Sequence, residues 1–155
     1  MKKTKYIKIL IGGYIIAVVW SLLATQMVNG LPHGWEISYR EWTQEWMPHM
    51  AVQTFKEEIL FRWMPFLTVS IVFPFLFSKS WIKEVLLVAT SICFGLYGDH
   101  YFPVAFVSGL VLGGTYVLSL QKKNVLHLDG LLIAFLVHLL HNITLVLIYC
   151  GGTFK

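Results

Sequence analysis

Two adjacent glutamates followed by an arginine stand out in a chain that is otherwise rich in apolar residues. The chain has eight acidic residues among its 155, and Glu57 and Glu58 are two of them. In a helix, Glu58 and Arg62 lie four residues apart on one face, so they can form an ion pair. Glu57 points about 100° away from Glu58 and does not share that partner. The spacing predicts a structural Glu58–Arg62 pair and leaves the Glu57 carboxylate available for acid–base chemistry.

A second polar cluster, His138, His141 and Asn142, lies within an apolar run near the C-terminal end. His138 and Asn142 are four residues apart and share a helix face, which His141 shares only in part. A histidine can hold a water or protonate a leaving amine, and an asparagine amide can stabilise an oxyanion. With Glu57, these residue types suit hydrolysis. An interhelical hydrogen bond is an equally good interpretation of His138, and His141 is more typical of packing or of a supporting contact.

The composition of the chain indicates that these groups lie in a protein embedded in a membrane. Hydrophobic residues make up 57% of the sequence and charged residues 13%, whereas soluble domains carry about 25% charged residues. We therefore expect an all-α fold, a polytopic membrane bundle of about five transmembrane helices, with residues 1–155 in a single domain. The lipid bilayer is its expected partner. The net charge of +4 comes from lysines in loops, which indicates membrane orientation and not nucleic-acid binding.

Five apolar runs account for the expected spans. The first follows the basic residues 2–8 and is too long for the apolar region of a cleaved signal peptide. The polar residues 29–50 are rich in tryptophan and form either an amphipathic surface helix or an ordinary loop. A polar break is expected at 78–84, and Pro65 and Pro74 are expected to kink the second helix. The spans are expected at residues 9–28, 51–77, 85–98, 104–120 and 130–149.

The lysines predict how the chain is oriented in its membrane. They cluster in residues 2–8, 79–83 and 122–123, which five spans place on one side, so the N-terminus is expected in the cytoplasm and the C-terminus outside. Four polar residues from three spans then lie at similar depth in the other half of the membrane. Because each is costly if it faces lipid, we expect one cavity, with the Glu57 carboxylate within one-water reach of His138. The four residues are Glu57, His100, His138 and Asn142.

Two of these clusters resemble motifs of the CPBP family of intramembrane proteases, which comprises the CAAX proteases and the bacteriocin-processing and immunity (Abi) proteins. Glu57-Glu58-Ile-Leu-Phe-Arg62 is similar to the EExxxR motif of that family. His138-Leu-Leu-His-Asn142 is similar to its HxxxN motif. The resemblance covers about residues 50–149, which would form the catalytic core.

The third motif of the family, FxxxH, is present in altered form. Phe94-Gly-Leu-Tyr-Gly-Asp-His100 carries the histidine two positions late, and Gly98 stands where the family has it. In addition, Trp63 replaces the glycine that usually follows the motif arginine. The middle motif therefore keeps a second interpretation open, a catalytically weak or inactive bacteriocin-immunity or interaction protein with the same fold.

The resemblance implies an intramembrane endopeptidase acting on a membrane-associated peptide, prenylated or of the bacteriocin type. Glu57 would activate the water and His100 would position it. His138 and Asn142 would form the oxyanion site. Both a metal-free glutamate mechanism and a divalent metal such as zinc stay open. Zinc would use Glu57, His100 and His138 as ligands, although the chain has no HExxH pair.

Overall fold

The described part of the chain is almost entirely helical and contains no strand. In the computed structural model, this part comprises residues 2–27, 46–97, 102–120 and 125–149. It confirms the expected all-α fold. His100, and the tryptophan-rich stretch as far as residue 45, lie outside it. The elements are α1 (Lys2–Met27), α3 (Met47–Glu58), η2 (Ile59–Trp63), α4 (Met64–Val72), α5 (Pro74–Phe77), α6 (Ser80–Leu96), α7 (Phe102–Ser119) and α8 (Leu128–Tyr149).

Three of these helices are long and apolar enough to cross a membrane. The spanning segments are Thr4–Ala24 in α1, Phe102–Ser119 in α7 and Leu128–Ile148 in α8. They correspond to the first, fourth and fifth expected spans and indicate an integral membrane protein. The expected second span is divided among α3, η2, α4 and α5, and the third is the 17-residue helix α6.

The second helical segment is interrupted at both of its internal prolines. Before Pro65, the helix widens into one π turn, η2, in which the Met64 amide donates to the Ile59 carbonyl. Proline lacks an N–H and its ring collides with the preceding turn, and a π turn is one way for a helix to absorb that misfit. Before Pro74, Phe73 leaves the helix with φ −129° and ψ 60°. The prolines therefore divide the segment as the sequence predicts.

The next helix begins earlier than expected. A polar break is expected over 78–84, but α6 already starts at Ser80, and Lys79 before it is extended, with φ −83° and ψ 133°. Polar side chains in this first turn do not prevent a helix at a membrane boundary, because a lysine can extend its charge away from apolar surroundings. The Lys83 ammonium group lies 5.0 Å from the centre of the Phe77 ring.

Small residues bring α6 and α7 close together. A side chain at Gly109 would meet Ser91 at 3.1 Å, and one at Gly113 would meet Leu87. These glycines are four residues apart on one face of α7, so their spacing permits the close approach of the two helices. The two glycines therefore serve the packing of α7 against α6.

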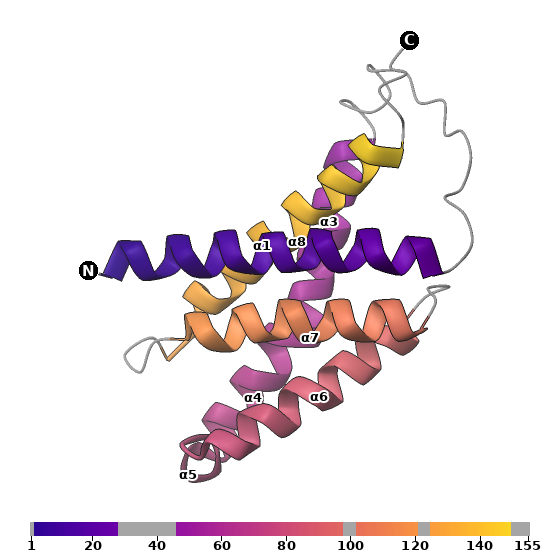
Figure 1. The fold of residues 1–155 in the computed structure, drawn as a ribbon. Helices are drawn as coiled ribbons and strands as arrows, with labels where there is room; N and C mark the ends of the chain where they lie inside the picture. Colours follow the sequence, from indigo (N-terminus) through magenta and orange to yellow (C-terminus); the bar gives the residue numbers. More distant parts are fainter. Residues whose placement is uncertain (1, 28–45, 98–101, 121–124, 150–155) are drawn as a thin grey trace.

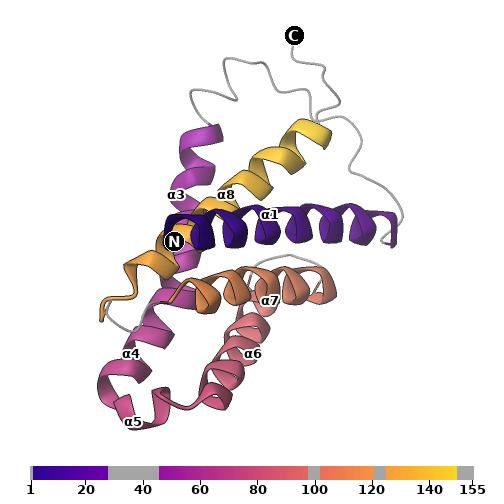
Figure 2. The ribbon, with the colours of Figure 1, turned by 60° about the vertical axis from the view of Figure 1, so that its left-hand side comes forward.

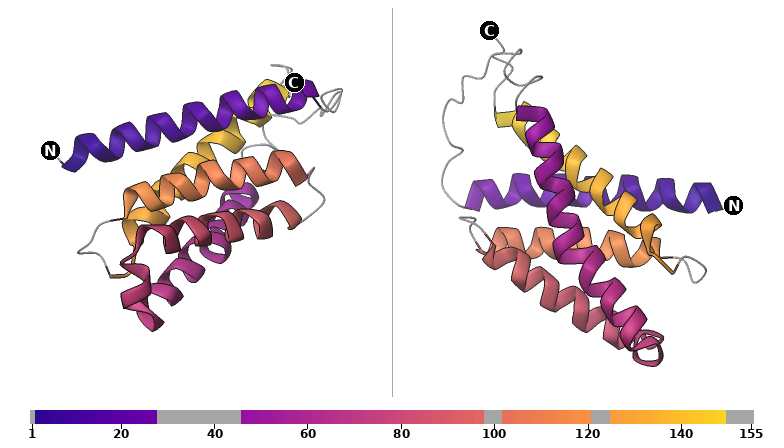
Figure 3. Two further views of the ribbon diagram at one scale, coloured as in Figure 1. Left: turned by 60° about the horizontal axis from the view of Figure 1, so that its bottom comes forward. Right: turned by 180° about the vertical axis from the view of Figure 1, so that it is seen from behind.

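Helix α8 lies between α1 and α3, which contact it from opposite sides (Figure 1; Figure 3, right). Helix α7 packs beside both α1 and α8, and α6 packs on α7 (Figure 2). The first turns of α1, the short α5 and the beginning of α8 lie at one end of the bundle (Figure 1; Figure 3, left). This arrangement brings the last turn of α3 against the middle of α8.

Candidate functional site

The contact between α3 and α8 brings the two sequence motifs together. Glu57 and Glu58 are the last residues of α3, and His138 lies in the middle of α8. One turn before the glutamates, the rings of Phe55 and Phe135 pack edge to face, with centroids 5.4 Å apart. This aromatic contact helps to fix the relative height of the two helices.

Glu58 and Arg62 form the expected ion pair in a fully buried position. Arg62 Nη1 lies 3.3 Å from Glu58 Oε1, and both residues are 0% exposed. The guanidinium carbon also lies 4.3 Å from the centre of the Phe94 ring of α6. A cation over an aromatic face gains additional electrostatic stabilisation when it is desolvated. The pair therefore links α3, η2 and α6 behind the site.

Glu58 has a second partner that the sequence does not predict. Its Oε1 lies 2.8 Å from His138 Nδ1. An ionised carboxylate only accepts hydrogen bonds, so Nδ1 carries the proton and donates it. In the neutral ring, Nε2 then presents a lone pair, and in the charged ring it presents an N–H. Glu58 thus fixes the orientation of the imidazole as well as pairing with Arg62.

Glu57 lies on the other side of the His138 ring. Its Oε2 is 3.7 Å from His138 Nε2, which is too long for a direct hydrogen bond but short enough for one water to contact both atoms. The Gln53 amide donates to Glu57 Oε1 at 2.9 Å. The Glu57 side chain is 14% exposed, compared with 0% for Glu58. The predicted proximity of Glu57 and His138 is therefore observed.

Asn142 faces α3 one turn further along α8. Its Nδ2 donates to Thr54 Oγ1 at 3.1 Å, and Thr54 is buried. An amide group has two N–H donors, so one of them is engaged with Thr54 and a second can serve a ligand. Glu57, His138 and Asn142 thus lie along one helix–helix contact. His100, the fourth predicted residue, lies outside the described residues.

His141 points toward a different helix. Its Nε2 is 2.6 Å from Ser21 Oγ of α1, and both residues are buried. The sequence favours packing or a supporting contact for His141, and the structure shows such a contact with α1.

The described residues do not form a set of metal ligands. Within the parts of the chain that the structure describes, no three His, Cys, Asp or Glu side chains are arranged to hold a metal ion. Glu57 Oε2 and His138 Nε2 could supply two ligands, and a carboxylate on the other ring nitrogen is typical of metal-binding histidines. The proposed third ligand, His100, belongs to the part that is not described.

The site contains two hydrogen bonds that were not expected, Gln53 with Glu57 and Asn142 with Thr54, and the sequence contains a signal for the first alone. Gln53 precedes Glu57 by four residues, so the same helical spacing that predicts the Glu58–Arg62 pair also favours this hydrogen bond. The contact of Thr54 with Asn142 has no local signal, because it depends on how α3 and α8 pack.

Comparisons with known proteins add no family assignment. No protein-family model matches the chain, and neither a curated protein nor a solved structure matches it significantly. Functional inference therefore rests on the geometry of the site and on the resemblance of its motifs.

Proposed function

We propose that this protein is an intramembrane endopeptidase in which Glu57 activates a water molecule. The observation that carries the proposal is the 3.7 Å separation between Glu57 Oε2 and His138 Nε2. A carboxylate and an imidazole at this distance can both contact one water that lies beside them and exchange a proton with it. Intramembrane acids are commonly functional, because a purely structural acid there is costly.

The proposed reaction is the addition of water across a peptide bond. Glu57 takes a proton from the water as its oxygen bonds to the carbonyl carbon. The amide donor of Asn142 that is not engaged with Thr54 stabilises the resulting oxyanion. The C–N bond then breaks, and Glu57 returns the proton to the leaving amine. Protonated His138, whose Nδ1–H is held by Glu58, donates its Nε2–H to the oxyanion.

The substrate class and the membrane topology belong to the same proposal. The resemblance of the two motifs to CPBP proteases supports a membrane-associated peptide, prenylated or of the bacteriocin type. Five spans with a cytoplasmic N-terminus would place Glu57, His138 and Asn142 in the outer half of a bacterial cytoplasmic membrane. The position of the first turns of α1 and of α5 at one end of the bundle supports this orientation (Figure 1).

One observation favours a second candidate, an immunity or interaction protein with the same fold but little catalysis. The Gln53 amide and the Thr54 hydroxyl already bind Glu57 and Asn142. A site whose polar groups satisfy one another can be retained for specific helix packing. In that case, replacing Glu57 would change stability or partner binding and no hydrolysis would be found.

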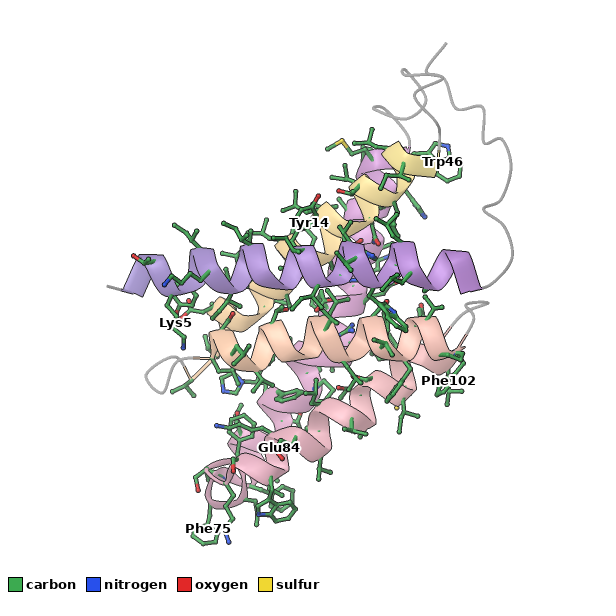
Figure 4. The ribbon with its side chains drawn as sticks, in the orientation of Figure 1. Lys5, Tyr14, Trp46, Phe75, Glu84 and Phe102 are labelled. Atoms are coloured by element: carbon green, nitrogen blue, oxygen red, sulfur yellow. The ribbon has the colours of Figure 1, made fainter. Side chains whose placement is uncertain are left out.

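The test is proteolysis of membrane-associated peptides by the purified protein in lipid nanodiscs. Glu57→Gln should reduce cleavage by about 100-fold or more, since it removes the general base while keeping the shape. Glu84→Gln makes the same chemical change at an exposed glutamate of α6 (Figure 4) and should leave the rate unchanged. A parallel series with a chelator tests metal dependence. Full activity of Glu57→Gln would refute the mechanism.

A further inference from the structure

Helix α8 is held by side-chain hydrogen bonds on two sides. Toward α3, His138 binds Glu58 and Asn142 binds Thr54. Toward α1, three further bonds are present, and they are distributed along the length of both helices. These are Tyr6–Asp129 at 3.2 Å, Tyr14–Thr144 at 2.8 Å and Ser21–His141 at 2.6 Å.

The Ser21–His141 bond lies at the height of the candidate site. His141 follows His138 by three residues, a rise of about 4.5 Å, and immediately precedes Asn142. Ser21 and His141 are 5% and 6% exposed. A serine 2.6 Å from an imidazole also has the geometry of a nucleophile and its base. The burial of both groups argues against that role, because a peptide carbonyl would have to reach Ser21 Oγ through packed side chains.

We propose that Ser21 is a positioning residue, which fixes the rotation of α8 through His141 so that His138 and Asn142 face Glu57. This inference rests on the hydrolysis proposed above. It makes α1, which lies outside the region that resembles the CPBP motifs, part of the working site. Its physical basis is that small displacements of catalytic groups reduce rates steeply, about 100-fold for 1 Å.

Tyr14 offers a matched control on the same pair of helices. The Thr144 hydroxyl donates to the Leu140 carbonyl at 2.8 Å, so the Tyr14 hydroxyl must be the donor in the Tyr14–Thr144 bond. Tyr14→Phe therefore removes one α1–α8 hydrogen bond while Thr144 keeps its other partner. Tyr14 lies on the side of α1 toward α8 (Figure 4).

The experiment compares Ser21→Ala, Ser21→Cys and Tyr14→Phe in nanodiscs by two readouts. The first is the ¹⁵N spectrum of the His138 ring, assigned by the loss of its signals in His138→Gln. Ser21→Ala should shift the His138 signals, and Tyr14→Phe should leave them in place. Ser21→Cys should shift them less than Ser21→Ala does, because a thiol keeps a weak hydrogen bond to His141. The second is peptide cleavage, where Ser21→Ala should lower kcat by about 10-fold or more with KM unchanged.

The two readouts separate this inference from the proposed function. His138 signals that stay unchanged in folded Ser21→Ala, or that shift equally in Tyr14→Phe, overturn the positioning role whatever the activity. Shifted signals in Ser21→Ala alone, in a wild-type protein that cleaves no peptide, would support the positioning of His138 and reject the peptidase. If Ser21→Ala does not fold, Ser21→Cys carries the comparison, because it nearly preserves volume.

Discussion

Replacing Arg62 by alanine should destabilise the protein strongly, because it leaves Glu58 buried without its cation. Glu58 and Arg62 are both 0% exposed, and breaking a buried ion pair by removing one partner costs about 3–5 kcal/mol. Glu58 keeps its hydrogen bond to His138, which favours the lower end of that range. The lost contact of the buried guanidinium with the Phe94 ring adds about 2 kcal/mol. We therefore expect a loss of about 5 kcal/mol.

The double variant Glu58→Leu/Arg62→Met should be milder than either single change. It removes both charges, and several polar atoms of the pair have no hydrogen-bond partner among the described residues, so little favourable hydrogen bonding is lost. The remaining destabilisation comes from the His138 Nδ1–H, which loses its acceptor, Glu58, at a cost of about 1–3 kcal/mol. Substituting apolar residues for a buried pair is otherwise often neutral.

Equilibrium unfolding in detergent micelles, followed by circular dichroism, measures these differences. Lys56→Ala is the matched control, since it removes an exposed cation from α3 and should change the free energy of unfolding by no more than about 0.5 kcal/mol. If Arg62→Ala unfolds like the wild type and loses only activity, the bracing role is wrong. Arg62 would then act within the site.

Two further predictions concern other parts of the chain. Reporter fusions after Lys123 and at Lys155 should report opposite sides of the membrane, and the same side for both would remove the fifth span from the topology. At His127, burial first and then nearby Lys83 lower the pKa below its ordinary value of 6.5, so the unfolded state binds a proton more readily than the fold. The stability that the fold gains by burying neutral His127 is therefore fully present above pH 6.5. It is lost as the pH falls below 6.5 toward the lower pKa of the folded state. His127→Asn, which tolerates the backbone φ of 54° at this position, should make unfolding less sensitive to acid over that range.

The sequence predicts those parts of the site that follow from spacing within one helix. Glu58 with Arg62 obeys the four-residue rule, and so does Gln53 with Glu57. The bond from His138 to Glu58 could not be predicted in this way, because it depends on the rotation and height of α3 against α8. Successive residues on a helix differ by about 100° in direction, so sequence alone does not decide which glutamate meets the histidine.

The fold shows the same division between local and non-local information. Apolar length predicts α1, α7 and α8, and proline chemistry predicts the breaks before Pro65 and Pro74. The expected start of α6 is wrong, because charged side chains in the first turn of a helix have the same composition as a polar loop. In a membrane protein, such residues can also occupy the first turn of a helix whose end lies at the boundary.

The division of roles between the two glutamates is less complete in the structure than in the sequence. Both Arg62 and His138 contact the same oxygen of Glu58, so the residue expected to be purely structural also orients the imidazole. Glu57 approaches the opposite ring nitrogen of His138. The ring therefore lies between the buried carboxylate of Glu58 and the partly exposed carboxylate of Glu57. A disturbance of the buried ion pair will therefore also move Nε2 of His138. For this reason, stability and activity must be measured on the same variants before either role is assigned.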